Sequence, residues 1–274
     1  MKRLTGIFFI LMLVTSCRLF AQGDLLITPK RIVFEGNKQR EEINLVNIGT
    51  DTATYSISFM QYTMKEDGSF VFIETPAAGQ MFADTFLRIF PRKVTLAPRE
   101  PQVISLQCRR GPSMVPGEYR SHLYFRSEKN TTPTGLENNT ADSTKLKIQL
   151  IPVFGLSIPV IIRMGDVNVN AGLQNFKLET LPDQTQIMHL SIMRTGNMSI
   201  YGDIIIQHFP ADGKPVDIGR VTNVGVYTTT DKRNIMVKLK NGTNKLTPGK
   251  LKIQYLTKTE KNTIIHAEGE MEIM

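Results

Sequence analysis

Residues 146–163 read LKIQLIPVFGLSIPVIIR, and every even-numbered position from Leu146 to Ile162 is apolar. The odd-numbered positions are mixed and include lysine, glutamine, serine and arginine. Alternate side chains of a β-strand share a face, so this pattern predicts a strand with one long apolar face. The 18 residues would extend roughly 60 Å, whereas a strand usually has about 5–6 residues. We therefore expect part of this strand to lie beyond the cover of its own domain.

Two prolines in the stretch, Pro152 and Pro159, indicate where the strand lies in its sheet. Proline has no N–H to donate, and in sheets it is confined to edges, strand starts and bulges. The pattern thus predicts an edge strand, which can pair with a strand of another chain. A core strand that crosses between two domains and breaks at Pro159 is the alternative, and periodicity alone leaves both open.

The segment before this strand has a different character. Residues 127–145 read SEKNTTPTGLENNTADSTK, which is almost free of apolar side chains. Such a composition predicts a long mobile loop, and loops of this length inside compact domains are uncommon and often functional. A loop next to an apolar edge would leave that edge accessible to a partner.

The rest of the chain repeats the two-residue period in shorter runs. Residues 54–59 and 250–255 alternate polar and apolar side chains. Turn signals separate such runs, among them Asp67-Gly68, Asp212-Gly213 and Pro248-Gly249. Many short strands at this spacing predict an all-β fold of sandwich type. The lengths divide the chain into two halves, residues 25–163 and 164–274, each near the size of one sandwich.

The first 21 residues read as an export signal. Lys2 and Arg3 precede the short apolar run of residues 6–15, and Ala21 fits the cleavage position. Residues 14–17, Val-Thr-Ser-Cys, also resemble a lipobox, so a lipoprotein anchored through Cys17 is the alternative to soluble release. The signal predicts a periplasmic protein with no membrane span. After its removal only Cys108 remains, and its two-residue spacing from Leu106 predicts a buried, unpaired thiol.

Charge and motifs exclude several classes of function. The formal charge is +8, and removal of Lys2, Arg3 and Arg18 leaves +5, because residues 1–21 hold no acid. The cations are dispersed, which disfavours a nucleic-acid partner. We find no metal-ligand spacing, phosphate-binding glycine loop or nucleophile motif. We therefore expect no enzyme, no metal or other cofactor and no small-molecule substrate, although a site assembled only in three dimensions would escape this argument.

Several segments, in their order along the chain, resemble the periplasmic pilus chaperones of the PapD-like family. Residues 28–36 (TPKRIVFEG) look like the family's opening strand, and residues 86–98 (FLRIFPRKVTLAP) look like its central region. Residues 116–125 (PGEYRSHLYF) resemble the segment that leads into its sixth strand. Residues 154–163, 194–202 and 246–249 look closest to the archaic branch of the family.

The resemblance implies two immunoglobulin-like sandwiches in a boomerang arrangement. It also implies binding of pilus subunits by donor-strand complementation and their delivery to an outer-membrane usher. The donor residues would be Ile148, Leu150, Pro152, Phe154 and Leu156. A structural two-sandwich adhesin or scaffold without chaperone activity is the alternative.

The resemblance further implies a basic pair that binds the carboxylate at the end of the subunit. Arg31 corresponds to its first member, and a guanidinium can hold a carboxylate with two hydrogen bonds. The second member, a lysine in the family, falls at Pro159. Arg88, Arg92 and Arg163 are the substitutes that the sequence offers.

Overall fold

We describe a computed structural model of the chain, over residues 25–112, 114–128, 154–240, 246–260 and 262–273. The described residues form an all-β structure of two sandwiches, which confirms the predicted fold class. Their one helix is a short 3₁₀ turn, Asp84–Phe86. The predicted signal, Cys17, most of the 127–145 loop and the donor residues Ile148, Leu150 and Pro152 lie outside the described residues.

Two sheets face each other in the first sandwich. One has the order β1-β3-β9-β7 and the other β2-β11-β10-β4-β8. The strands are β1 (Leu25–Thr28), β2 (Ile32–Phe34), β3 (Arg40–Asn47), β4 (Ala53–Met60), β7 (Leu87–Phe90), β8 (Lys93–Leu96), β9 (Pro101–Cys108), β10 (Gly117–Glu128) and β11 (Gly155–Met164).

The second sandwich follows without a break in the chain. Its sheets have the orders β12-β13-β16 and β15-β14-β17-β18. The strands are β12 (Val169–Thr180), β13 (Gln186–Gly196), β14 (Ile200–Pro210), β15 (Val216–Val226), β16 (Lys232–Lys238), β17 (Gly249–Lys258) and β18 (Thr263–Ile273).

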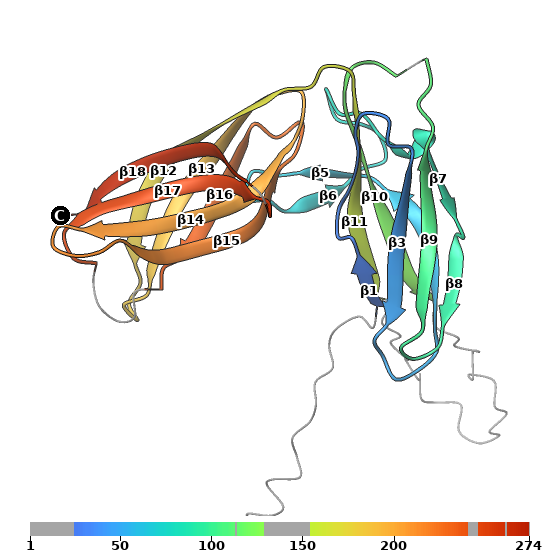
Figure 1. Cartoon of the computed structure of the whole chain (residues 1–274), viewed down its shortest axis with the longest axis horizontal. Coiled ribbons are helices and arrows are strands. Elements are labelled where there is room, and N and C mark those ends of the chain that lie inside the picture. The colour runs from blue at the N-terminus through green and yellow to red at the C-terminus, as the bar shows by residue number, and fades with distance from the viewer. Residues whose placement is uncertain (1–24, 113, 129–153, 241–245, 261, 274) are drawn as a thin grey trace, which may run out of the picture.

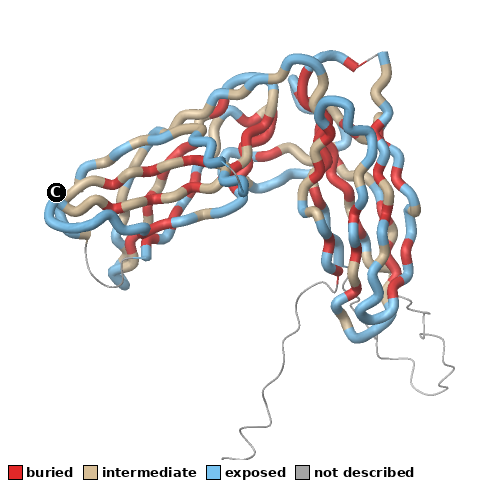
Figure 2. Tube along the Cα trace, viewed as in Figure 1, coloured by how far each residue is buried: buried red, intermediate tan, exposed pale blue. Residues whose placement is uncertain are grey.

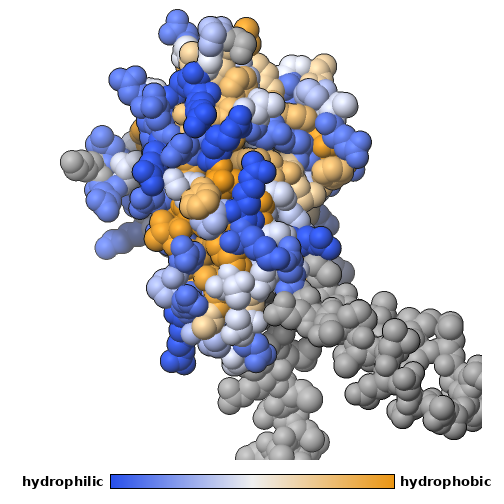
Figure 3. Space-filling model, turned by 90° about the vertical axis from the view of Figure 1, so that its right-hand side faces the viewer, coloured by the Kyte–Doolittle hydropathy of each residue, from blue (hydrophilic) through white to orange (hydrophobic). Residues whose placement is uncertain are grey.

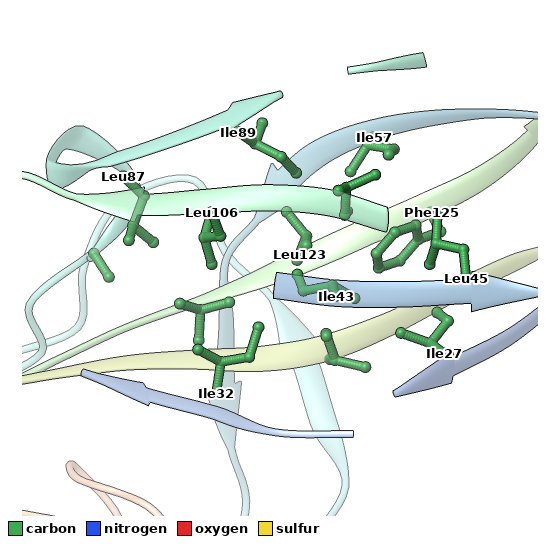
Figure 4. Close-up of a cluster of buried hydrophobic side chains, with 14 of the residues drawn as sticks. Ile27, Ile32, Ile43, Leu45, Ile57, Leu87, Ile89, Leu106, Leu123 and Phe125 are labelled. Atoms are coloured by element: carbon green, nitrogen blue, oxygen red, sulfur yellow. The ribbon is translucent and has the colours of Figure 1, made fainter. Parts of the chain in front are cut away.

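Alternating side chains fill the space between the two sheets of the first sandwich. Ile43 and Leu45 on β3 meet Leu123 and Phe125 on β10, and all four are buried (Figure 4). Cys108 is a buried free thiol in the same cluster, as its spacing predicts. Burial raises the pKa of this thiol, which keeps it protonated and unreactive. A separate cluster forms the core of the second sandwich, so each half buries its own apolar face (Figure 2).

A tyrosine at the start of β10 supports the immunoglobulin-like reading of the first sandwich. The Tyr119 hydroxyl donates to the Val115 carbonyl at 3.1 Å and accepts from the Val115 N–H at 2.8 Å. This contact, a few residues upstream of a central strand, matches the tyrosine corner of immunoglobulin-like domains. Its ring packs edge-on against Phe86 at 5.3 Å between centroids.

The two sandwiches are set at a wide angle, and a hairpin joins them (Figure 1). This hairpin consists of β5 (Tyr62–Met64) and β6 (Phe70–Phe72), a two-stranded sheet of its own. The predicted turn Asp67-Gly68 forms its tip, where Gly68 has a φ of +82°, which favours glycine.

The hairpin begins in the first sandwich and ends against the second. Thr230 Oγ1 donates to the Met64 carbonyl at 2.7 Å, and Asn234 N–H donates to the Glu66 carbonyl at 2.6 Å. Met64 also packs with Ile161 of β11 and Tyr227 of the second sandwich in a buried cluster. The hairpin therefore fixes one sandwich against the other.

Candidate functional site

The edge of β11 is open over its first half. β10 pairs with β11 from Gly155 to Met164, whereas β2 pairs with it only from Val160 to Ile162. Among the described residues, no strand pairs with residues 155–159 on the side away from β10. The predicted edge strand is thus present at this end, and the stretch nearer Arg163 is covered on both sides.

The ladder between β10 and β11 shows which backbone groups lie on the open side. Ser127 N–H donates to the Phe154 carbonyl at 2.9 Å, and these two residues are directly opposite in register. Hydrogen-bonded and non-hydrogen-bonded pairs alternate along an antiparallel ladder. The backbone groups of Gly155, Ser157 and Pro159 therefore point away from β10. Pro159 sits where its missing N–H costs no bond with β10.

The apolar face of β11 continues past the end of the core. Ile158, Val160 and Ile162 are buried in the cluster of the first sandwich. Phe154 and Leu156 precede them on the same face, and they are 48% and 39% exposed. These two side chains and the open edge beside them form a surface that another strand can complete, and we call it the donor edge.

Gly155 has no side chain, and the Tyr124 side chain occupies the space beside it. A Cβ at residue 155 would overlap the ring and hydroxyl of Tyr124, which lies on the neighbouring strand β10. A larger residue at 155 would therefore displace Tyr124. This close approach explains a glycine within a strand, where glycine otherwise weakens pairing.

Arg31 lies between the two sandwiches, beside the donor strand. Ile32, the next residue, pairs with Val160, so Arg31 is level with Pro159 on the adjacent strand. Its guanidinium carbon lies 4.7 Å from the centroid of the Tyr201 ring on β14, a cation–π contact. Nε and Nη2 of Arg31 are buried and have no hydrogen-bond acceptor among the described residues.

A second arginine, Arg120, lies on β10, the other neighbour of β11, and faces the same gap between the sandwiches. Arg120 on β10 is only 1% exposed, and its guanidinium carbon lies 4.3 Å from the centroid of the Tyr227 ring. Its Nη2 donates to the Tyr62 carbonyl at 3.1 Å, while Nε and Nη1 have no acceptor in the described part of the chain. Arg233 of β16 lies near the same tyrosines and also has a buried Nε without an acceptor.

Burial shapes the electrostatics of this arginine–tyrosine cluster (Arg31, Arg120, Arg233, Tyr201 and Tyr227). Burial lowers the pKa of Arg120 and of Arg233, because it penalises the charged guanidinium. Burial likewise raises the pKa of Tyr227 and of Tyr201, so both phenols stay neutral. The charge of Glu118 raises the pKa of Arg120; Oε2 of Glu118 accepts from Ser199 and Arg163, while its Oε1 is buried without a hydrogen-bond donor among the described residues. A carboxylate that entered the cluster would give the arginine N–H groups the acceptors they lack.

The three arginines that the sequence offered as substitute carboxylate anchors do not belong to this cluster. Arg163 is on β11 but is bound by Glu118, Glu35 and the Ser199 carbonyl. Arg88 is on β7, an edge strand of the sheet that contains neither β2 nor β11, and it donates to the carbonyls of Leu87 and Thr85. Arg92 is exposed just after β7. The structure thus brings Arg31 together with Arg120 and Arg233 rather than with Arg88 or Arg92.

Sequence reasoning missed Arg120, Arg233, Tyr201 and Tyr227. Arg120 and Tyr201 fall inside segments that carry the family resemblance, residues 116–125 and 194–202. Arg120 shares a strand face with Glu118 and His122, which from sequence alone indicates a face turned toward solvent, so no local signal pointed to its burial. Its burial depends on Tyr62 and Tyr227, which are far away in sequence.

Other surfaces of the described chain offer less chemistry. The face of the first sandwich turned away from the second sandwich carries apolar patches among charged side chains (Figure 3). Exposed apolar residues of the sheet that contains β7 include Phe90 and Val103. Within the described ranges, no group of three or more His, Cys, Asp or Glu side chains has an arrangement that could bind a metal ion. No helix among them has the length and apolar character needed to cross a membrane.

Comparisons with known proteins found matches among solved structures. No family model matches the chain, and no curated protein matches it. Among solved structures, the chain is similar to the YadV chaperone, with 12% identity, a TM-score of 0.45, and coverage of 92% of this chain and 100% of that one.

Two further structures illustrate the range of the matches. The complex of CsuC with the CsuE tip adhesion subunit, from the archaic chaperone-usher Csu pili of Acinetobacter baumannii, has 10% identity and a TM-score of 0.44. That match covers 89% of this chain and 99% of the other. The periplasmic chaperone SfaE has 8% identity and a TM-score of 0.40, with coverage of 88% and 98%.

Proposed function

We propose that the chain is a periplasmic chaperone that captures pilus subunits by lending them a strand and delivers them to an outer-membrane usher. The observation that carries this proposal is the donor edge of β11. Its backbone groups at Gly155 and Ser157 face away from β10, and Phe154 and Leu156 stand exposed beside them. The sequence resemblance supplies the class of client, an incomplete sandwich that lacks a strand.

Strand donation accounts for both features of the donor edge. Backbone hydrogen bonds to a client would provide affinity independent of its sequence, while Phe154 and Leu156 would fill the gap in its core. Each large apolar side chain that becomes fully buried contributes about 1.5–3 kcal/mol before ordering costs. The residues Ile148, Leu150 and Pro152 would extend the same apolar face along the client.

The arginine–tyrosine cluster supports a carboxylate anchor within the same function. Arg31 would bind the terminal carboxylate of the client, as the resemblance implies. Arg120 would take the role of the family's lysine, whose position is occupied by Pro159 in this chain. Removal of one partner of a desolvated charge pair costs about 2–5 kcal/mol. The loss of Arg31 should therefore weaken capture by a factor of about 30 or more.

Co-expression tests strand donation directly. The tagged chain would be produced in a periplasm together with each pilus subunit of its own organism, and co-purified subunit would be quantified. We expect Leu156→Glu to reduce capture at least tenfold. Ile264→Glu, at a similarly exposed position on β18 of the second sandwich, serves as the matched control and should capture normally. Undiminished capture by Leu156→Glu would overturn the proposal, and stable self-assembly without any client would favour the scaffold alternative.

The anchor is tested with a modified client. Three extra residues at the end of the captured subunit would move its carboxylate away from the cluster. Arg31→Ala should weaken binding of the native subunit strongly and of the extended subunit little. Equal losses for both subunits would show that Arg31 does not read the carboxylate.

A further inference from the structure

Four arginines outside the proposed site surround an exposed phenylalanine on the first sandwich. Arg88 and Phe90 occupy the outward positions of β7, whose other two residues are buried. Arg40 on β3 and Arg88 on β7 lie on either side of Gln107 on β9, in one row of the sheet. Neighbouring strands are about 4.8 Å apart, so the backbones of these two arginines are about 10 Å from each other.

Two further arginines extend this group along the sheet and around its edge. Arg109 N–H donates to the Phe86 carbonyl at 2.8 Å, which continues the ladder of β7 and β9 by one residue. Arg109 is exposed on the outward face of this sheet, as the alternation of side chains requires. Arg92 follows Phe90 by two residues, and its carbonyl accepts from Ile57 N–H of the opposite sheet at 2.8 Å. The chain therefore turns from one sheet to the other here, and Phe90 stands at the corner.

The charge of this surface is not neutralised within the described chain. We call the surface the arginine corner, and it consists of Arg40, Arg88, Arg92, Arg109 and Phe90. All four arginines are exposed, and none of them forms an ion pair with a described acid. Glu42 is the only acid at the outward positions of β1, β3, β7 and β9, so positive charge predominates on this side.

Phe90 adds a protruding apolar group to the arginine corner. It is 78% exposed, more than any other large apolar residue in the described part of the chain. On the side of the molecule that carries β7, apolar patches lie among strongly hydrophilic side chains (Figure 3). A protein–protein interface normally has a contiguous apolar core depleted of charge, and the arginine corner offers one ring among guanidinium groups instead.

This combination suits the surface of an anionic lipid bilayer. Guanidinium groups form charge-assisted hydrogen bonds to phosphate, and each basic side chain near an anionic membrane adds to the attraction. Apolar side chains such as phenylalanine insert at the boundary between headgroups and acyl chains. A fluid bilayer accepts a protruding ring without a preformed pocket, whereas a protein partner needs a complementary one.

We propose that the arginine corner binds the phosphate headgroups of an anionic bilayer, with Phe90 inserted between them, and holds the protein at a membrane surface. The arginine corner lies on the sheet β1-β3-β9-β7 and its edge, whereas the donor edge belongs to β11 in the other sheet. The two surfaces are therefore separate, and the membrane contact does not depend on the proposed chaperone function.

A tryptophan at residue 90 reports insertion directly, because the chain contains no tryptophan of its own. The exported protein, carrying Cys17→Ser so that no lipid anchor can form, would be mixed with vesicles of phosphatidylglycerol or of phosphatidylcholine. We expect the emission of Phe90→Trp to shift to shorter wavelengths only with phosphatidylglycerol. Met236→Trp, at a position 69% exposed on β16, is the matched control and should show no shift.

Charge substitutions test the contribution of the arginines. Arg88→Gln together with Arg92→Gln should weaken sedimentation with phosphatidylglycerol vesicles at least tenfold, at about fivefold for each arginine lost. Lys214→Gln together with Lys258→Gln removes the same charge from exposed positions of the second sandwich and should bind vesicles as wild type does. Sodium chloride at about 0.5 M should release the protein, because it screens exposed charges.

Several outcomes would overturn the membrane contact. They are an unshifted emission of Phe90→Trp with phosphatidylglycerol, an equal shift of Met236→Trp, and equal losses in the two charge variants. Displacement by millimolar inorganic phosphate would show a site for free anions instead. Subunit capture should stay normal in both charge variants. If Arg88→Gln with Arg92→Gln abolished capture, the arginine corner would be a contact for a protein partner and the membrane assignment would be wrong.

Discussion

Pro159 lies directly opposite His122 on β10, and its missing N–H is turned toward the open edge of β11. The proline that replaces the expected lysine therefore does not disturb the ladder that holds β11 to its own sheet. Leu156, three residues earlier, is opposite Phe125 at a position that bonds to β10. Substitutions at these two positions therefore test which backbone groups of β11 bond to β10 and which face the open edge.

We predict that Pro159→Val changes the free energy of unfolding by less than about 1 kcal/mol, because no ladder bond is gained with β10. Leu156→Pro should cost about 2 kcal/mol more than Leu156→Ala, since it breaks a bond and leaves the Phe125 carbonyl unsatisfied. Urea denaturation of the three variants measures these differences. Equal stability of Leu156→Pro and Leu156→Ala would contradict the register.

His122 should make stability depend on pH. Burial, together with the charge of Arg120, lowers its pKa to about 3. In the unfolded chain its pKa is about 6.5, so the unfolded state binds more protons below that pH. The contribution of His122 is complete above pH 6.5 and declines as the pH falls toward 3, with a loss on the order of 1–2 kcal/mol at pH 5.

The variant His122→Phe isolates this effect. Phenylalanine can keep the edge-on ring contacts with Tyr62 and Phe70, whose centroids lie 4.9 and 5.4 Å from that of His122. Urea denaturation at pH 5 and pH 7.5 should show a smaller pH-dependent loss in the variant than in wild type. Burial also lowers the pKa of His266, but that contribution is common to both proteins. Identical pH dependence would exclude His122 as the source.

We expect Arg120 to strengthen subunit binding and to destabilise the free chain. Its guanidinium is buried, and its Nε and Nη1 lack acceptors in the described chain; unpaired buried charge is unfavourable. We predict that Arg120→Met stabilises the free chain by about 1 kcal/mol and weakens subunit capture at least tenfold. Thermal denaturation and co-purification provide the two readouts. A variant that is both less stable and fully competent in capture would contradict this role.

The contact between the hairpin and the second sandwich should contribute measurably to stability. Thr230→Val removes the donor to the buried Met64 carbonyl and should cost about 1–2 kcal/mol. Glu66→Gln removes an exposed ion pair with Lys232, and we expect a change below about 0.5 kcal/mol. Denaturant unfolding of both variants is the measurement. A larger loss in Glu66→Gln than in Thr230→Val would mean that the buried bond is not what holds the hairpin.

Local patterns predicted the strands and turns well, because the two-residue period reports which face of a strand is covered. Phe154 and Leu156 continue the apolar face of Ile158, and the structure leaves them exposed at an open edge. The same pattern did not explain the burial of Ile161, because the side chain of Ile161 faces away from the core of the first sandwich. It is buried because Met64 and Tyr227 cover it from the hairpin and the second sandwich.

The arginine–tyrosine cluster could not be predicted in the same way. Arg31 and Tyr201 belong to different sandwiches and are far apart in the chain, and no local period encodes their contact. Two of the substitute arginines proposed from the sequence, Arg88 and Arg92, come from residues 86–98, a segment that resembles the central region of the family. Arg88 lies on β7, in the opposite sheet, and Arg92 lies in the exposed bend between β7 and β8. Only the three-dimensional pairing of β2, β11 and β10 brings Arg31 and Arg120 to one side.

The backbone itself connects the two sandwiches only once, over residues 165–168, between the end of β11 and the start of β12. The hairpin, the stacked Arg120 and Tyr227, and the bond from Ser199 Oγ to Glu118 at 2.8 Å join them without that connection. A protease that cut this connection would therefore release no fragment from the folded protein. The two pieces would stay associated as a nicked complex and separate only when denatured.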